Sequence, residues 1–101
     1  DFTFGLWNGD QLSPIGKAYF GFDDNELKVL DKFVRKNTIK KFGPVREVEK
    51  TFVIEIAFDA VNESNRHKSG VALRFPRIKR LREDKPASEV IQLSQFKSEF
   101  L

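Results

Sequence analysis

The sequence predicts a small, mainly β domain with one long helix and a short C-terminal helix. Apolar side chains alternate in several short runs that are separated by turn residues, a pattern typical of strands. Only one segment, at about residues 23–41, has apolar residues at helical spacing. The chain has 101 residues, of which 40% are hydrophobic and eleven are Phe. This length fits one domain, and this composition is sufficient for a core.

The first 22 residues predict a β-hairpin. Apolar residues alternate from Phe2 to Leu6, and the turn sequence that follows contains Gly9. A second apolar-rich run then extends to Phe22. Two strands joined by a short turn are therefore expected at the start of the chain.

Residues 23–41 predict the helix. Asp23 and Glu26 fit a capping box, in which each side chain accepts a hydrogen bond from the other residue's backbone. Acidic residues lead and basic residues trail, which complements the helix dipole. Gly43-Pro44 is expected to end the helix. The apolar residues at helical spacing are Leu27, Leu30, Phe33 and Val34.

Two longer strands are expected in the second half, over residues 45–61 and 71–84, with a polar loop over 62–70. Pro86 suits the first turn of a short final helix. About five strands with a capping helix favour a five-stranded, closed or partly open barrel of the OB-fold class, a class that commonly binds nucleic acids. The core face of the first of these strands is expected to hold Phe52, Ile54, Ile56 and Phe58.

Positive charge is concentrated in one part of the sequence. Residues 66–85 hold eight Lys or Arg and two acids, a net charge of +6, whereas the rest of the chain sums to −3. Such a local excess favours a polyanionic partner. The alternative is a solvated surface on which the charge has no partner.

Composition excludes several classes of protein. The chain has no Cys, so it has no disulfide framework or thiolate zinc site and fits a reducing compartment. No apolar run approaches the ~18 residues of a membrane span, so we expect no membrane span, and we expect no signal peptide. The chain has no Met and opens on strand-like residues, so we expect a fragment of a longer protein.

A self-sufficient catalytic site is not predicted. His67, the one histidine, lies in the polar loop without Cys or an obvious Ser partner, so we expect a surface residue. The helix cap accounts for Asp23 and Asp24. Glu55 and Asp59 share a strand face and are expected to be solvated or paired with nearby bases rather than bound to a metal.

The basic segment contains a proline that cannot donate a strand hydrogen bond, so Pro76 predicts an edge, a bulge or a bend. On an unbroken strand the cations would divide between two faces, whereas a bend would let both sets approach one curved polyanion. Contacts to phosphates would then make binding salt-dependent, without base reading. The two sets are Arg74, Arg80 and Arg82, and Arg77 and Lys79.

Phe75 has two possible roles. Its alternation with Val71 and Leu73 favours a core position. Its place between Arg74 and the expected bend instead allows an outward-facing side chain, of the kind that minor-groove binders insert as an apolar wedge beside Arg.

These residues resemble a known family. "HKSGVALRFPRIKRLREDKPASE" is similar to the C-terminal segment of ATP-dependent DNA ligases, in which a strand of the form "LRFPR" leads into the nucleotidyltransferase motif VI, "R-x-D-K". Here these are residues 73–77 and 82–85. The upstream "TFVIEIAFDAV" and "YFGFDDNELKVLDKFVRKNTIKKFGPVR" are also similar, the latter to the bacterial branch, so the match covers essentially the whole chain.

The resemblance implies that residues 1–101 are one OB-fold domain that follows an adenylation domain. The family's AMP-accepting lysine lies in a "K-x-D-G" motif that this chain lacks, so the chain alone should not ligate. Motif VI implies that Arg82 and Lys85 orient the ATP phosphates, with Asp84 as the acidic member.

The "RFPR" strand implies that Arg74 and Phe75 enter the minor groove near a nick. By charge and position, further phosphate contacts are expected from Arg66, Lys68, Arg77 and Lys79.

The resemblance further implies ATP and Mg²⁺ for the parent enzyme, with neither expected on the isolated domain. The implied partners are nicked double-stranded DNA and the adenylation domain of the same chain, in a monomer without membrane contact. The implied location is the bacterial cytoplasm, with the nucleoid. Replication, repair and recombination all use such enzymes.

Three other functions stay open. A free-standing single-strand binder would stack bases on exposed aromatics, for which Trp7 and Tyr19 are the candidates besides Phe. The equivalent domain of an mRNA-capping or RNA-ligating nucleotidyltransferase would share motif VI. A protein-interaction module could carry a basic face with no role in binding.

Overall fold

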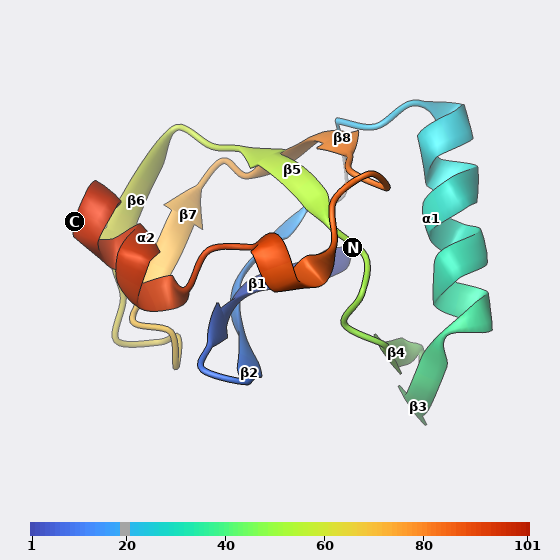
Figure 1. Ribbon diagram of the computed structural model, residues 1–101, viewed down its shortest axis with the longest axis horizontal. Coiled ribbons are helices and arrows are strands. Elements are labelled where there is room, and N and C mark those ends of the chain that lie inside the picture. Colours follow the sequence, from blue (N-terminus) through green and yellow to red (C-terminus); the bar gives the residue numbers. More distant parts are fainter. Residues whose placement is uncertain (19–20) are drawn as a thin grey trace.

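The computed structural model describes residues 1–18 and 21–101, and this part is mainly β with two α-helices, as predicted (Figure 1). The elements in chain order are β1 (Phe2–Asn8), β2 (Gln11–Ala18), α1 (Asp24–Lys36), β3 (Thr38–Phe42), β4 (Val45–Val48), β5 (Ile54–Ala57), β6 (Ala60–Glu63), β7 (Val71–Arg74), β8 (Arg77–Leu81), the short 3₁₀ helix η1 (Ala87–Glu89) and α2 (Leu93–Phe100).

The predicted N-terminal hairpin is confirmed. β1 and β2 pair antiparallel, and Asn8 opposes Gln11 across the turn. Gly9 has a φ of 68°, a left-handed conformation that this tight turn requires and that glycine adopts without steric cost. β2 ends at Ala18, and the expected continuation through Tyr19 lies outside the described residues.

The predicted capping box is present at the start of α1. Asp23 Oδ1 accepts a hydrogen bond from the Glu26 backbone at 2.8 Å, and the Asp23 backbone donates to Glu26 Oε1 at 3.2 Å. Leu30 is the most buried residue of the helix, at 6% exposed. The helix ends at Lys36, so the prediction that it continues to residue 41 is wrong.

A second hairpin, β3–β4, follows the helix directly. Thr38 Oγ1 donates to the carbonyl of Val34 at 2.6 Å, which satisfies one carbonyl of the last helical turn. Thr38 and Ile39 are β-branched and favour an extended backbone. Gly43, with a φ of 62°, lies in the turn of this hairpin, so Gly43-Pro44 reverses a strand and does not end a helix.

The two predicted strands of the second half form one bent antiparallel ribbon. β5 pairs with β8 and β6 pairs with β7, and the pairing continues across the bend through the Asp59 backbone, which donates to the Arg74 carbonyl at 2.9 Å. The predicted strand over residues 71–84 is thus broken in two, and the one over residues 45–61 in three, of which β4 pairs with β3 outside this ribbon. Together with β3–β4, this gives the described part eight strands rather than about five.

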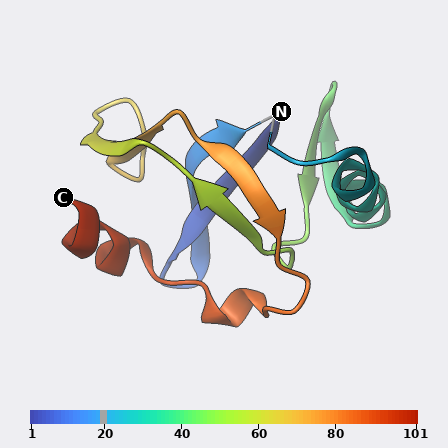
Figure 2. The ribbon, with the colours of Figure 1, turned by 90° about the horizontal axis from the view of Figure 1, so that it is seen from above.

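The described strands are joined by hydrogen bonds in four antiparallel pairs, and no closed hydrogen-bonded cylinder is found among them. Three of the pairs, β1–β2, β5–β8 and β6–β7, contribute side chains to one core, whereas no described residue of β3–β4 belongs to it. The β3–β4 hairpin lies beside α1 (Figure 2). The side chains predicted for the core face of residues 45–61 are only partly buried, and Val53 between them is 8% exposed.

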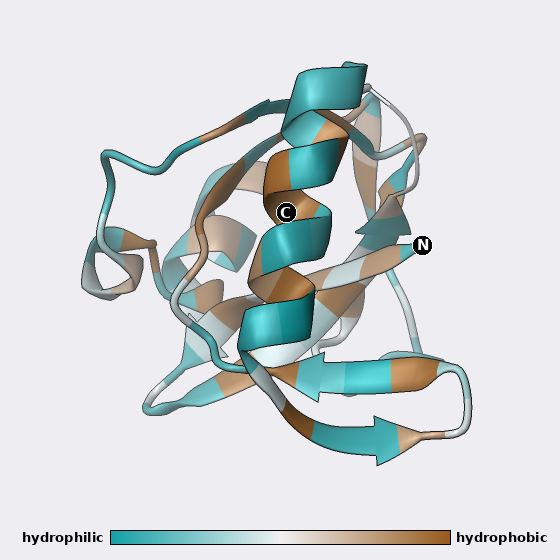
Figure 3. Ribbon diagram, turned by 90° about the vertical axis from the view of Figure 1, so that its right-hand side faces the viewer, coloured by the Kyte–Doolittle hydropathy of each residue, from teal (hydrophilic) through white to brown (hydrophobic). Residues whose placement is uncertain are grey.

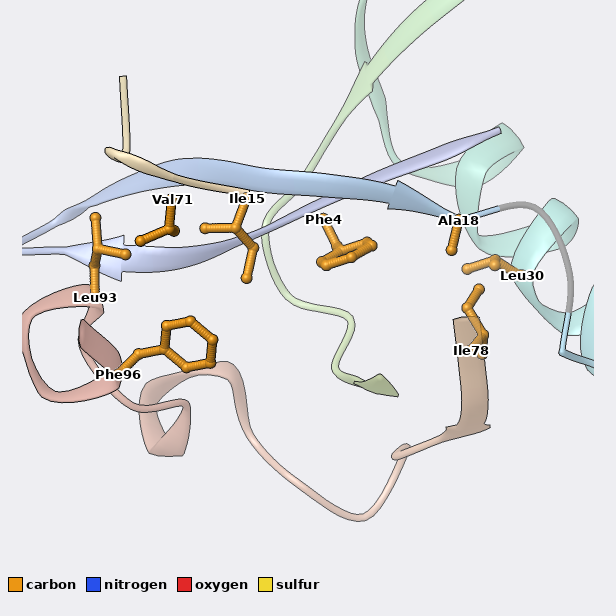
Figure 4. Close-up of a cluster of buried hydrophobic side chains, with 8 residues drawn as sticks. All are labelled: Phe4, Ile15, Ala18, Leu30, Val71, Ile78, Leu93 and Phe96. Atoms are coloured by element: carbon orange, nitrogen blue, oxygen red, sulfur yellow. The ribbon is translucent and has the colours of Figure 1, made fainter. Parts of the chain in front are cut away.

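The core brings together side chains from both ends of the chain (Figure 4). Val71 and Ile78 are almost fully buried, at 0% and 1% exposed, so the basic segment is anchored in the core at two points. The eight buried residues of this cluster are Phe4, Ile15, Ala18, Leu30, Val71, Ile78, Leu93 and Phe96.

The C-terminal segment is hydrogen-bonded to β1 and to the β1–β2 turn. Trp7 Nε1 donates to the carbonyl of Ala87 at 2.8 Å, and the Gly9 backbone donates to Gln92 Oε1 at 2.9 Å. The predicted short final helix is present as α2, but Pro86 precedes η1 and not this helix. No described helix is long and apolar enough to cross a membrane.

Candidate phosphate and nucleic-acid interface

The predicted site is the C-terminal basic segment, residues 66–85, which runs from the β6–β7 loop through β7 and β8 to the turn beyond β8. Ile78 points into the core from the middle of β8. Its neighbours Lys79 and Arg80 are exposed. The core therefore fixes the strand and leaves these cations at the surface.

The bend predicted at Pro76 is present, and Phe75 lies at its centre. The chain leaves the pairing with β6 at Arg74 and enters the pairing with β5 at Arg77. Phe75 has a φ of 57°, which is an outlier for a bulky residue, and its side chain is 59% exposed. The core alternative for Phe75 is therefore wrong.

Arg77 braces this bend. Its Nη1 donates to the Phe75 carbonyl at 3.0 Å and to Asp59 Oδ1 at 3.1 Å. The same guanidinium lies 5.6 Å from the centroid of the Phe75 ring, in cation–π range. Arg77 thus contacts both the backbone and the ring of the residue whose conformation is strained.

Three cations converge on Glu55 of β5. Arg80 Nε lies 3.0 Å and Arg82 Nη1 3.4 Å from Oε1, while Lys79 Nζ lies 3.4 Å from Oε2. The β5–β8 register shifts between Glu55 and Ile56, so Lys79 is an extra residue opposite this point. Neighbours that an ideal strand would place on opposite faces therefore reach one carboxylate.

This convergence changes the chemistry of Glu55. The hydrogen bond from Arg80 holds the pKa of the Glu55 carboxyl below its ordinary value, with a smaller contribution from Lys79. The expectation that Glu55 and Asp59 pair with nearby bases is confirmed. No group of three or more His, Cys, Asp or Glu side chains that could hold a metal ion occurs among the described residues.

Arg82 and Asp84 form a two-pronged ion pair directly after β8. Arg82 Nε donates to Oδ1 at 3.1 Å and Nη2 donates to Oδ2 at 3.2 Å. Each partner favours the charged form of the other, so the pKa of Asp84 is lowered and that of Arg82 is raised. The guanidinium is held in a defined orientation by Asp84 on one side and Glu55 on the other.

Lys85 lies on the same turn as Arg82. Its backbone donates to the Arg82 carbonyl at 3.3 Å, and its side chain is half-buried. A guanidinium has five N–H donors, of which the carboxylates use three, and an ammonium has three. This donor set, on one tight turn, fits the phosphate oxygens of a nucleotide.

The turn beyond β8 is also tied to α1. Glu26 Oε2 accepts a hydrogen bond from the Leu81 backbone at 3.3 Å, while its Oε1 completes the capping box. The first turn of the helix and the residue before Arg82 are therefore held by one carboxylate.

The β6–β7 loop carries Arg66 and Lys68, both exposed. Ser64 Oγ lies 2.8 Å from His67 Nδ1 and accepts from the Arg66 backbone at 3.3 Å. His67 is exposed as predicted, but the expectation that it has no Ser partner is wrong. In the described part of the chain, no carboxylate is within ion-pair distance of Arg66, Lys68, Arg74 or Lys85.

The net charge of −3 outside residues 66–85 conceals a second group of cations. Residues 28–46 hold seven Lys or Arg and one acid, a net charge of +6. The chain outside both segments has three Lys and twelve acids. A charge count in a sliding window would have found it.

Comparison with known proteins agrees with these motifs. The family model for the ATP dependent DNA ligase C terminal region matches residues 1–85. The chain belongs to this family.

The chain is also similar to curated ligases. It is 50% identical over 95 residues to a "Probable DNA ligase" of Koribacter versatilis, covering 94% of this chain and 16% of that protein. It is 42% identical over 97 residues to a "Probable DNA ligase" of Opitutus terrae, covering 93% and 10%. A "DNA ligase" of Methanococcoides burtonii is 38% identical over 88 residues, covering 87% and 16%. The chain thus spans between a tenth and a sixth of these relatives' length.

One aromatic expected to be available for base stacking has a structural role in this ligase domain. Trp7 is half-buried, and its N–H is bonded to the segment that follows motif VI. Tyr19, the other candidate, lies outside the described residues. The ligase family and the use of Trp7 leave the single-strand-binding alternative with little support.

Proposed function

We propose that the chain is the C-terminal OB-fold domain, residues 1–101, of a bacterial ATP-dependent DNA ligase. It would orient ATP phosphates while the adenylation domain of the same chain takes AMP, and then help to clamp nicked duplex DNA for sealing. The observation that carries this proposal is the fixed Arg82 guanidinium beside Lys85, in a chain of this ligase family.

The ATP-facing part would be Arg82, Asp84 and Lys85. Bound ATP would supply the adenylyl group and a pyrophosphate leaving group, whose charge grows as the bond breaks. Asp84 and Glu55 hold the Arg82 guanidinium in place, so that its remaining N–H groups need no reorganisation to meet phosphate oxygens. ATP and Mg²⁺ would belong to the parent enzyme, with neither expected on the isolated domain.

The DNA-facing part would be centred on Phe75. An exposed aromatic at a strained bend, next to Arg74 and braced by Arg77, has the composition of a minor-groove wedge. Arg66, Lys68 and Lys79 would add phosphate contacts along the same segment. We place the parent enzyme in the cytoplasm with the nucleoid, as a monomer.

Self-adenylation tests the ATP-facing part. In the complete protein that contains this chain, Arg82→Ala and Lys85→Ala are expected to impair self-adenylation from ATP more than sealing of pre-adenylated nicks. Arg80→Ala is the matched control, because Arg80 shares the Glu55 contact but lies outside motif VI. Equal losses in both steps would refute the phosphate-orienting role.

Nick sealing tests the DNA-facing part. Phe75→Ala should reduce sealing of a pre-adenylated nick and lower the free energy of unfolding by no more than about 1 kcal/mol, because the ring is 59% exposed and its cation–π contact with Arg77 lies at the surface. Phe100→Ala, at an exposed aromatic of α2, is the control. Full sealing by the Phe75 variant would contradict the wedge.

We also expect the 101-residue chain by itself to form no covalent AMP adduct and to seal no nicks, because it lacks a "K-x-D-G" motif. Incubation with labelled ATP followed by denaturing electrophoresis measures both. A labelled chain would show that a nucleophile other than the family lysine is present.

A further inference from the structure

Residues 28–46 place a second basic surface on α1 and the β3–β4 hairpin. α1 contributes Lys28, Lys32, Arg35 and Lys36, and the hairpin contributes Lys40, Lys41 and Arg46. All seven side chains are exposed. We call these seven side chains the helix–hairpin surface.

The helical part of this surface lies on one face of α1. Leu27, Leu30, Phe33 and Val34 turn towards the protein and are buried or half-buried, so the cations occupy the opposite face. This face is directed towards the viewer in Figure 3 and is mostly hydrophilic. Its four cations line one shallow depression together with Asp31, the one acid of residues 28–46.

No cation of the helix–hairpin surface forms an ion pair with a described carboxylate. None of the seven lies within 4.0 Å of a carboxylate oxygen in the described part of the chain. Lys40 opposes Glu47 across the hairpin, but Glu47 is bonded to Lys50 at 2.9 Å. A solvated helix face normally carries both signs of charge in neighbouring positions, which offset one another.

The tip of the hairpin is apolar as well as exposed. Phe42 and Val45 oppose one another next to the turn, at 57% and 61% exposed, and Lys41 and Arg46 form the adjacent pair. Two-stranded β-ribbons bind in DNA grooves, and groove-binding proteins often place apolar side chains beside Lys or Arg. Exposure of two large apolar side chains to water is unfavourable, so this tip is better explained by a partner that covers it.

The size of the molecule limits the length of duplex that it can cover. The longest extent of the molecule is 35 Å. At 3.4 Å per phosphate along one strand, this corresponds to about ten base pairs. The rest of the chain has three Lys against twelve acids, so its negative charge would repel DNA from the other faces.

We propose that the helix–hairpin surface is a second DNA-binding site, which contacts phosphates of the duplex flanking the nick through its cations and a groove through Phe42 and Val45. This proposal rests on the proposed function for the identity of the polyanion as nicked duplex DNA. It concerns residues that lie outside the "RFPR" strand and motif VI.

The test is the salt dependence of DNA binding by the complete protein that contains this chain. Fluorescence anisotropy with a labelled nicked duplex would compare Lys36→Gln/Lys41→Gln with Lys17→Gln/Lys97→Gln, which removes the same charge outside both basic regions. The first variant should lower the slope of log K against log salt by about 1.8, and weaken binding at 0.1 M salt by about tenfold or more. The second should change neither quantity.

Two further variants keep the outcome decisive. Arg35→Gln/Arg46→Gln should repeat the loss of slope, and circular dichroism checks that each variant is folded. Phe42→Ala should weaken binding at an unchanged salt slope, because an apolar contact releases no counterions. An unchanged slope in both charge variants would overturn the proposal. This is also the result expected if the surface binds an acidic protein instead of DNA. An unchanged affinity in Phe42→Ala would overturn the contact of the tip.

These results are separable from those that test the proposed function. If Arg82→Ala adenylates normally but the Lys36→Gln/Lys41→Gln slope falls, the ATP role fails and the second DNA site stands. If the adenylation defect is found and the slope is unchanged, only the second site fails.

Discussion

The two basic regions carry the same net charge of +6 but differ in how many of their cations lie within ion-pair distance of a described carboxylate, four of eight in the first and none of seven in the second. In the C-terminal basic segment, Arg77, Lys79, Arg80 and Arg82 are each within ion-pair distance of a carboxylate. In the helix–hairpin surface, no cation is so placed among the described residues. Two regions of equal net charge can therefore differ in whether their cations are held in place by carboxylates or are exposed without such a contact.

The difference suits two kinds of anion. A cation held by carboxylates has lost side-chain freedom before any ligand arrives, so it can orient a small phosphate group at little further entropic cost. An exposed, unpaired Lys keeps that freedom and can follow the phosphates of a long duplex. The contrast predicts that the first region governs adenylation and that the second governs affinity.

The largest expected effect comes from the core beneath the first region. Ile78→Ala should lower the free energy of unfolding by about 2–5 kcal/mol, because Ile78 is 1% exposed and its removal leaves a cavity below the paired cations. Urea unfolding measures this change. Ile39→Ala in the hairpin, at 46% exposed, should cost less than about 1 kcal/mol, and equal losses would show that both regions are anchored alike.

A smaller effect is expected at the start of α1. Asp23→Ala removes the side chain that accepts the Glu26 backbone N–H, and should lower the free energy of unfolding by about 1 kcal/mol. Asp23→Asn keeps an accepting oxygen and serves as the control. If Asp23→Ala unfolds at the same urea concentration as the parent chain, the cap does not support the helix that carries the second region.

The smallest effect is the pH dependence of the paired region. The folded-state pKa of Glu55 is below the ordinary value of 4.5, so its ion pairs stabilise the fold above that pH and are lost as the pH falls through the lowered pKa. Glu55→Gln should therefore be less stable than the parent chain at neutral pH, with the difference shrinking as the pH falls below the ordinary value of 4.5 and through the lowered pKa. Lys36→Gln should show no such trend, because no carboxylate of residues 1–18 or 21–101 lies within ion-pair distance of Lys36.

Unfolding by urea at several pH values measures this difference. A stability gap between the parent chain and Glu55→Gln that is the same at neutral and acidic pH would contradict the ion-paired state of Glu55.

Sequence patterns predicted the elements whose local signals agree with their packing. The N-terminal hairpin, the capping box at Asp23 and the bend at Pro76 each depend on neighbouring residues alone. The hairpin after α1 was missed, because Gly43-Pro44 is an equally good signal for a helix end and for a strand reversal. The β-branched pair Thr38-Ile39 was the sign that the helix had already ended.

The residues of the C-terminal basic segment could be predicted from the sequence, but the contacts between their side chains could not. Alternation cannot foresee the register shift at Glu55, which brings Lys79 and Arg80 to one carboxylate. Alternation also fails at Phe75, because a residue with a positive φ is not part of an extended strand. The arrangement of Arg82 between Asp84 and Glu55 depends on contacts across 27 residues of sequence.

Glu26 connects the two basic regions, because its carboxylate accepts one hydrogen bond from the cap of α1 and one from the end of β8. One of its oxygens completes the cap of α1, and the other holds the backbone of Leu81, the residue before Arg82. Any displacement of the β8 end that breaks this second bond also releases a group that the first helical turn uses. Exchanging α1 for another helix would therefore remove both hydrogen bonds unless the new helix has a glutamate at this position.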